Sequence, residues 1–211
     1  MLGLLRKNQE ANGTLLPEKF DFSNLTISGS GITYKNIRAK HLIFCEGYQA
    51  TQNPYFSWLP FALNKGELLE ISVKNFPEEC IYNKGVYVVP LEPGKWKVGA
   101  TYNWREPDEL PTEAGFNELK TRLQQLVKLP VQPQAHYAGI RPAVRDRKPL
   151  IGTHPELPAV HIFNGMGSKG VLMAPWLADH FSEVLTGNAV LLPEADINRF
   201  RKLFYERELR I

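Results

Sequence analysis

Short apolar runs rich in β-branched and aromatic residues recur along most of the chain, and they predict more strands than helices. The run HLIFC at His41–Cys45 is dense enough to predict a strand that is buried on both faces. Val86–Leu91 and Trp96–Thr101 flank the turn sequence EPGK, which predicts an antiparallel hairpin. The other strand candidates are Leu15–Phe22, Leu25–Ser28, Gly31–Ile37, Leu68–Val73 and Gln134–Ile140.

Helical spacing of apolar residues is confined to a few segments. Leu2–Ala11 predicts a helix that ends at Asn12-Gly13. Thr112 is a good N-cap, and the apolar residues that follow it predict a helix that Pro130 ends. The tail from Pro193 to Ile211 predicts a basic amphipathic helix.

A strand, a glycine turn and a helix are predicted in succession between Ala159 and Leu185. Gly165, Gly167 and Gly170 form the pattern G-x-G-x-x-G at the start of this helix. Such a turn brings backbone N–H groups and a helix dipole to a phosphate or another electron-rich group. The alternative is a turn that only joins a strand to a packed helix, because a dinucleotide fold normally begins with this motif.

Composition excludes several classes of protein. The 211 residues are 43% hydrophobic and 22% charged, with a net charge of +3, which is too weak to indicate nucleic acid. Cys45 and Cys80 have no zinc spacing and are expected to be buried thiols, and the five histidines share no ligand spacing, so no metal is expected. Without an apolar run of about 20 residues or a signal peptide, no membrane is expected and a cytoplasmic location is the default.

Several short motifs occur in the order of one known family. They are Ile43-Phe44-Cys45-Glu46-Gly47, Lys65-Gly66-Glu67, Tyr87-Val88-Val89-Pro90, Ala138-Gly139-Ile140-Arg141-Pro142, Pro149-Leu150-Ile151-Gly152 and the segment Asn164–Pro175. In order and spacing the span Leu15–Leu185 resembles the D-amino-acid oxidase and glycine oxidase family of FAD-dependent oxidoreductases. The resemblance implies oxidation of the C–N bond of an amino acid or another amine, with hydride transfer to FAD.

The resemblance also implies a fold and a domain arrangement. We expect an α+β chain from an α/β parent, with a mixed or antiparallel sheet domain inserted in a partial FAD-binding domain. Residues 1–49 and 143–211 would form the FAD-binding part, and residues 50–142 the substrate-binding cap. The family's amino-terminal dinucleotide-binding unit has no counterpart here, so the chain is expected to be truncated and to bind FAD weakly. Strand edges left open by that loss would favour a homodimer.

Arg141 is the first candidate for the substrate site. By resemblance it binds the substrate carboxylate, and a guanidinium suits this role because it forms two parallel hydrogen bonds with a carboxylate. The alternative is a structural ion pair with Asp146. Tyr87 falls at the family's tyrosine before V-V-P and could bind the same carboxylate, or could be an ordinary strand residue.

The candidate cofactor-binding residues come from two turns. Gly47 follows the first predicted FAD-side strand, and the resemblance places the second turn beside the ribityl chain and the flavin ring, where a helix N-terminus would stabilise negative charge. The residues of the second turn are Gly165, Met166, Gly167, Ser168, Lys169, Gly170 and Val171.

Two other functions remain open. Ser168 stands where some relatives carry a larger basic residue, and the turn G-S-K-G also resembles that of the FAD domain that oxidises a modified wobble uridine in tRNA. A tRNA substrate would need a basic surface, for which Lys120, Arg122, Lys128, Arg145, Arg147 and Lys148 are candidates. The third reading is a module that folds without flavin and has no catalytic role.

Overall fold

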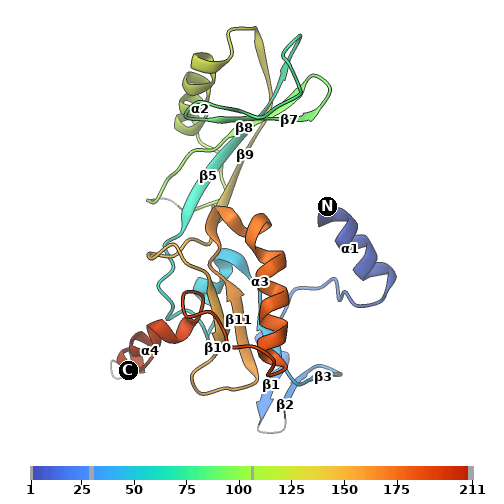
Figure 1. Ribbon diagram of the computed structural model, residues 1–211, viewed down its shortest axis with the longest axis vertical. Helices are drawn as coiled ribbons and strands as arrows, with labels where there is room; N and C mark the ends of the chain where they lie inside the picture. Colours follow the sequence, from blue (N-terminus) through green and yellow to red (C-terminus); the bar gives the residue numbers. More distant parts are fainter. Residues whose placement is uncertain (1, 29–30, 106, 209–211) are drawn as a thin grey trace. The chain divides into compact units, whose positions relative to one another are not determined.

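The computed structural model describes residues 2–28, 31–105 and 107–208 (Figure 1). The chain divides into two compact units, Met1–Leu42 and Ile43–Ile211. The candidate substrate residues and the glycine turn all belong to the second unit, so the fold of that unit determines the geometry of the site.

The first unit contains one helix and a small antiparallel sheet. The helix α1 (Leu2–Ala11) has the predicted bounds, and the sheet order is β1-β2-β3. The strand predicted at Leu15–Phe22 is wrong, because Pro17 has no N–H for a strand ladder and Asp21 caps a short 3-10 helix. The strands are β1 (Leu25–Ser28), β2 (Gly31–Tyr34) and β3 (Ile37–Ala39).

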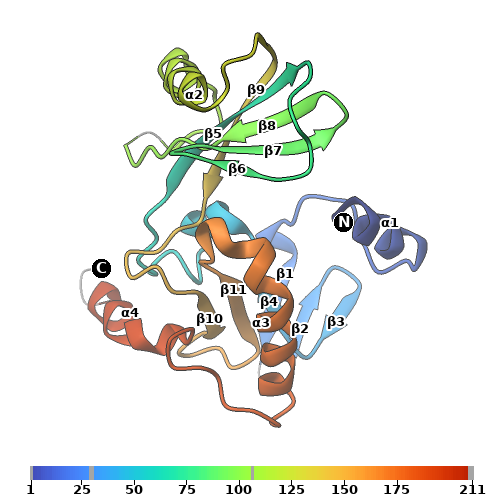
Figure 2. The same cartoon turned by 45° about the horizontal axis from the view of Figure 1, so that its top comes forward.

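The second unit begins with a five-stranded antiparallel sheet in the order β6-β7-β8-β5-β9. The helix α2 (Glu113–Leu126) lies against one face of this sheet (Figure 2), and Thr112 caps it as predicted. The predicted hairpin is confirmed as β7 and β8. The strands are β5 (Asn64–Val73), β6 (Tyr82–Asn83), β7 (Tyr87–Glu92), β8 (Lys95–Gly99) and β9 (Val131–Arg141).

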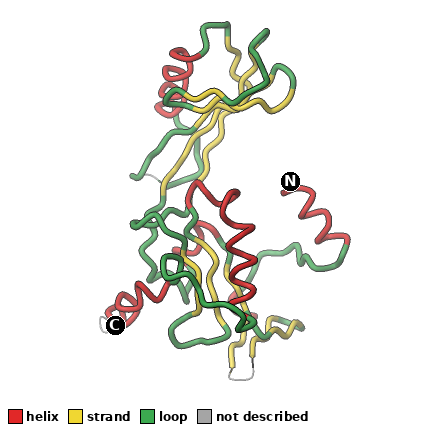
Figure 3. The backbone as a smooth tube through the Cα atoms, in the orientation of Figure 1, coloured by secondary structure: helices red, strands yellow, loops and turns green. Residues whose placement is uncertain are grey.

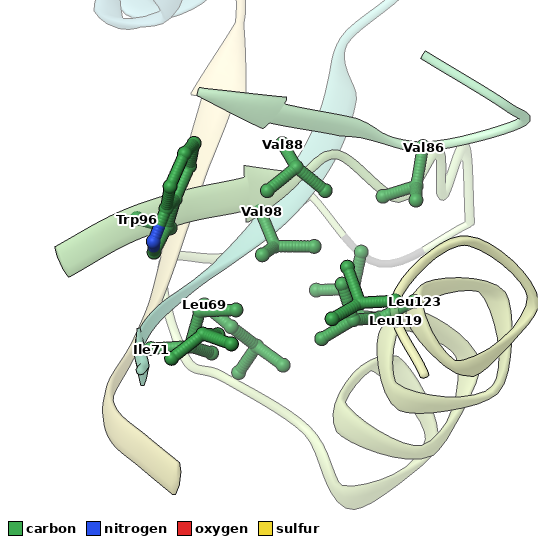
Figure 4. Close-up of a cluster of buried hydrophobic side chains, with 10 residues drawn as sticks. Leu69, Ile71, Val86, Val88, Trp96, Val98, Leu119 and Leu123 are labelled. Carbon is green, nitrogen blue, oxygen red and sulfur yellow. The ribbon is translucent and has the colours of Figure 1, made fainter. Parts of the chain in front are cut away.

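Alternate residues of the strands build a hydrophobic core beneath α2 (Figure 4). Ile71 pairs with Trp96, and Leu69 pairs with Val98, so both pairs point to the same face as the helix. The other face of the sheet is left open to the rest of the unit. The buried residues of this core are Leu69, Ile71, Val73, Val86, Val88, Trp96, Val98, Leu119, Leu123 and Val127.

A second sheet, in the order β10-β11-β4, positions the glycine turn. The chain leaves β11, passes through the turn and enters α3, which packs beside the sheet (Figures 1 and 3). A short 3-10 helix and α4 follow. The elements are β4 (Leu42–Phe44), β10 (Leu150–Thr153), β11 (Val160–Asn164), α3 (Gly170–Leu185), the 3-10 helix Ile197–Phe200 and α4 (Arg201–Glu208).

Several expectations about exposure and pairing are corrected. Ile43 in β4 is 38% exposed, so this strand is not buried on both faces, and Cys45 and Cys80 are exposed rather than buried. The strands β4 and β11 are hydrogen-bonded neighbours, and β11 is the central strand of its sheet. The tail forms a 3-10 helix and then α4, and residues 209–211 lie outside the described part. Among the described residues, no helix is long and apolar enough to cross a membrane.

Candidate functional site

A cavity of about 410 Å³ lies where the end of β9, the segment after it and the glycine turn meet. The open face of the five-stranded sheet supplies one side, and the turn between β11 and α3 supplies the other. Arg141 therefore shares one cavity with the predicted cofactor-binding turn. The lining residues are Asn64, Tyr102, Trp104, Arg141, Ala143, Val144, Arg147, Gly165, Met166, Gly167, Ser168 and Lys169.

Arg141 is held by one edge of its guanidinium group. Its Nη1 donates to Asn64 Oδ1 at 2.6 Å and to the Thr101 carbonyl at 3.3 Å, and its Cζ lies 4.5 Å from the centre of the Tyr102 ring. Among the described residues, neither Nε nor Nη2 has a protein acceptor and no carboxylate pairs with this arginine. A guanidinium anchored in this way presents two parallel donors to a ligand.

The charge of Arg141 is not balanced by the protein. Burial lowers the pKa of its guanidinium below the ordinary value, because a less hydrated site disfavours the charged form, and the nearby Tyr102 acts in the opposite direction. The group still carries its charge at neutral pH. The alternative pairing with Asp146 does not form, because the carboxylate of Asp146 binds Arg199 at 2.8 Å.

Gly66 forms the surface on which Arg141 rests. A Cβ at this position would lie 2.1 Å from Arg141 Nη2 and 2.4 Å from Cζ, so any larger residue would displace the guanidinium. Gly139, the register partner of Gly66 on β9, has no heavy atom within 4 Å of such a Cβ. The two glycines are therefore different in kind: Gly66 makes room for Arg141, and Gly139 faces open space.

The residues on either side of Gly66 point to the opposite face of the sheet and anchor other elements. Lys65 is fully buried, and its Nζ lies 2.6 Å from Asp108 in the loop that carries Tyr102 and Trp104. Glu67 accepts hydrogen bonds from the N–H and the hydroxyl of Thr112 at 2.9 and 2.8 Å, at the start of α2.

The close fit of Glu67 depends on another glycine. A Cβ on Gly115 would collide with the Glu67 carboxylate, so a larger residue there would have to displace that carboxylate. Nε2 of His136 also lies 2.8 Å from this carboxylate. Three consecutive residues of β5 therefore contact three different parts of the unit. Lys65 contacts the loop that carries Tyr102 and Trp104, Gly66 contacts Arg141, and Glu67 contacts the start of α2.

The glycine turn is shaped by backbone conformations that suit glycine. Gly165 has φ +76°, and a Cβ on it would lie 2.7 Å from the Leu150 backbone nitrogen. The side chain of Asn164 links this turn to the other predicted cofactor residue, since its Nδ2 donates to the Gly47 carbonyl at 2.8 Å and its Oδ1 accepts from Gly165 N–H. Gly47 itself has φ +59°.

The start of α3 offers a positive environment. Lys169 at the N-cap makes no side-chain cap, and the first turn contains no acidic residue. The unneutralised N-terminus of a helix of this length favours an electron-rich group, so the donor set agrees with the flavin that the resemblance implies. Of the described residues, no group of three or more His, Cys, Asp and Glu could hold a metal ion.

The other predicted residues are placed less centrally. Tyr87 is opposite Gly99, which is opposite Leu68, so it shares the open face of the sheet with Arg141. However, Tyr87 is 55% exposed and does not line the cavity. Gly170 and Val171 form the first residues of α3 outside the lining, and Val171 is 69% exposed.

Sequence reasoning missed several lining residues. Asn64 immediately precedes the Lys65-Gly66-Glu67 motif, and its register pairing with Arg141 could only be found once the strands were aligned. Tyr102 and Trp104 lie in a loop without a recognisable motif. The sequence suggests Arg147 only as part of a basic surface and not as a lining residue of the cavity.

Comparison with known proteins identifies the family of the chain. Residues 3–184 match the family described as DAO, FAD dependent oxidoreductase. The chain belongs to this family. Glycine oxidase from Bacillus subtilis is 32% identical over 131 residues, which are 60% of this chain and 35% of that protein. A tRNA 5-methylaminomethyl-2-thiouridine biosynthesis bifunctional protein from Maricaulis maris is 35% identical over 106 residues, which are 48% of this chain and 17% of that protein.

Solved structures show the same fold. Glycine oxidase from Geobacillus kaustophilus superposes with a TM-score of 0.65 at 20% identity, covering 80% of this chain and 46% of that one. L-proline dehydrogenase from P. horikoshii gives a TM-score of 0.66 at 20% identity, covering 85% and 50%. The chain thus spans about a third of the glycine oxidase sequence from B. subtilis and about half of these two solved chains. The expected likeness to the glycine oxidase family is confirmed, and the family to which the chain belongs is one of FAD-dependent oxidoreductases.

Proposed function

We propose that this chain forms the substrate-binding cap and part of the flavin pocket of an oxidoreductase that oxidises the C–N bond of an amino acid or a similar amine. The observation that carries the proposal is the guanidinium of Arg141, which is tied to Asn64 and Thr101 by one edge and keeps its other donors free inside the cavity. A carboxylate is the ligand that such a fork fits best.

In this proposal the residues of the chain bind and orient the substrate. Arg141 holds the carboxylate, which fixes the α-carbon between the sheet and the glycine turn. Tyr102 and Trp104 line the cavity on the side of their loop. Gly165 to Val171, together with Gly47, would hold the flavin, with the N-terminus of α3 favouring its electron-rich edge. Bound FAD would supply the hydride acceptor for this oxidation.

The proposed domain arrangement follows the same division. Residues 50–142 would be the cap, and residues 1–49 with 143–211 would be the FAD-binding part. A homodimer through sheet edges is the proposed assembly. Flavin absorbance and the mass in solution test it: a monomer that binds FAD stoichiometrically would contradict the need for a second copy of the chain.

The decisive test is carboxylate binding. Arg141→Lys keeps the charge but loses the fork, and Arg141→Ala loses both. We expect each to weaken binding of acetate or benzoate, with the alanine variant losing about 2–5 kcal/mol when the carboxylate is desolvated in the cavity. Arg145→Ala, which removes a cation outside the cavity lining, is the matched control. Equal carboxylate affinity in all of these proteins would reject the proposed role of Arg141.

A second function is favoured by one observation, the 35% identity to the tRNA-modifying protein from M. maris. In that case the oxidised amine would belong to a modified base. The candidate basic residues do not gather around the cavity: Lys120 lies on α2 beneath the closed face of the sheet, whereas Arg147 lines the cavity. Binding of tRNA at physiological salt, competing with small carboxylates, would favour this function over the first.

A further inference from the structure

The cavity that holds Arg141 also contains two other cations. Arg147 comes from the turn after β9, and Lys169 comes from the glycine turn. None of the described lining residues carries a carboxylate, and within the described part of the chain neither cation has an ion pair. One substrate carboxylate on Arg141 would therefore leave the cavity with positive charge still unbalanced.

Arg147 is held there at a conformational cost. Its φ is +59°, in the left-handed region where glycine is favoured and where other residues typically lose about 1 kcal/mol. Residues in costly backbone conformations persist where surrounding contacts enforce them, and they are frequent at functional sites.

The surrounding contacts that enforce this turn come from Arg199. Its Nε binds Asp146 Oδ2 at 2.8 Å, and its Nη2 donates to the Pro149 carbonyl at 2.8 Å. Asp146 also accepts from the N–H of Lys148, and the N–H of Arg147 donates to the Val144 carbonyl at 3.0 Å. The turn is therefore clamped on both sides of Arg147, while the side chain of Arg147 is left without a protein partner among the described residues.

We propose that Arg147 binds a second anionic group of the substrate, so that the substrate is an amine or amino acid carrying two carboxylates. Arg141 binds the carboxylate next to the oxidised carbon, and Arg147 binds the distal one. This inference rests on the proposed function, because it needs the first carboxylate to be seated on Arg141. Lys169 adds a general attraction for anions at the mouth of the cavity.

Unreactive carboxylates provide the test. Acetate is the singly charged probe, and malonate, succinate and glutarate form a ladder of increasing distance between two carboxylates. Calorimetric titration of the chain at low ionic strength is expected to show a preference for one dicarboxylate over acetate. Arg147→Gln should reduce that preference about threefold to fivefold, as for an exposed ion pair, and added salt should reduce it in the parent.

Two matched variants separate binding from folding. Arg145→Gln removes a neighbouring cation that does not line the cavity, and it should leave the preference unchanged. Arg147→Gly removes the side chain and relieves the left-handed strain, so its melting temperature should equal or exceed that of the parent while the dicarboxylate preference falls. This combination cannot arise from a purely structural role.

Three other sets of results would contradict the proposed role of Arg147 or the function on which it rests. Equal affinity for acetate and every dicarboxylate, or an equal effect of Arg145→Gln and Arg147→Gln, would show that Arg147 reads no second group. Loss of FAD affinity in Arg147→Gln with an unchanged dicarboxylate preference would assign the residue to the cofactor's diphosphate. Failure of every carboxylate to bind, or binding that is insensitive to Arg141→Lys, would instead reject the proposed function itself.

Discussion

The two faces of the five-stranded sheet are built from the same strands but carry side chains of very different size. On the face beneath α2, large apolar residues such as Trp96 and Val98 pack into a buried core. On the open face, Gly66, Gly99 and Gly139 occur where side chains would otherwise stand. The face beneath α2 therefore contributes to stability through its large side chains, whereas the candidate site on the open face depends on the absence of side chains at these glycines.

The contrast is sharpest along β5. Lys65 and Glu67 point to the face of α2, where each anchors another element, and Gly66 between them points to the cavity. Because side chains alternate in a strand, a short motif can serve both faces at once. In this motif, Lys65 and Glu67 therefore hold other elements on one face of the sheet, and Gly66 leaves room for Arg141 on the other face.

Substitution on the two faces should affect stability very differently. Trp96→Ala, on the closed face, should cost about 3–5 kcal/mol of unfolding free energy, because it removes a fully buried aromatic side chain. Tyr137→Ala, on the open face, should cost less than about 1 kcal/mol, since that side chain is half exposed. Urea unfolding followed by circular dichroism measures both. Similar losses would show that the open face is also a stabilising core.

The buried anchor Glu67 should matter less than the apolar core but more than a surface charge. Glu67→Gln keeps the size and one acceptor, but loses a charge-assisted bond to the start of α2. We expect a loss of about 1–3 kcal/mol. The control is Glu70→Gln, three residues further along β5, where the side chain points to the open face of the sheet. This variant should cost under about 1 kcal/mol. If the two variants unfold at the same urea concentration, Glu67 does not anchor α2.

Much of this arrangement could be predicted from the sequence, and what could not has identifiable causes. The helix at Leu2–Ala11, the cap at Thr112 and the hairpin depend on local signals, so they were predictable. Arg141 and the glycine turn were found by their motifs. Asn64 was not found, because its role comes from strand register, which a single strand does not encode.

The predictions that were wrong also failed because other residues override what a short stretch of sequence indicates. The run Leu15–Phe22 has strand composition, but Pro17 and the cap at Asp21 override it. Cys45 and Cys80 are exposed although free thiols are usually buried, because exposure depends on which elements pack over a loop. Arg147 lines the cavity because it lies in a left-handed turn that Arg199 holds in place. Arg199 follows about 50 residues later in the chain, so no local sequence pattern indicates this contact.

The open face can be disturbed without touching the core. Gly66→Ala should displace Arg141 and weaken acetate binding about tenfold, which corresponds to about 1.4 kcal/mol. Gly139→Ala adds the same methyl group to the neighbouring strand in open space, and it should leave acetate affinity unchanged. Calorimetric titration of the two variants measures the difference. Equal weakening would mean that any methyl group on this face disturbs the site, and that Gly66 has no specific role.

The smallest expected effect concerns the link between the two faces, the contact of Lys65 with Asp108. Hydrogen bonds from Lys65 and from the N–H of Leu110 lower the pKa of the Asp108 carboxyl below its ordinary value of 3.8. A carboxyl group whose pKa is lower in the folded state stabilises that state above the unfolded pKa, and this contribution is lost as the pH falls through the folded value. The loop that carries Trp104 should therefore loosen only below about pH 3.8.

Fluorescence of Trp104 during acid titration measures this loosening, and Trp104→Phe identifies its share of the signal. Asp108→Asn should remove the acid transition and leave the loop loosened at neutral pH, because among the described residues Lys65 then keeps only Glu67, 3.9 Å away, as an anionic neighbour. The transition should not change the circular dichroism of the sheet, since the buried residues of the core beneath α2 are apolar and do not include Lys65 or Asp108. If the sheet and the loop respond to acid together, the loop is part of the cooperative core and the two faces are not energetically separate.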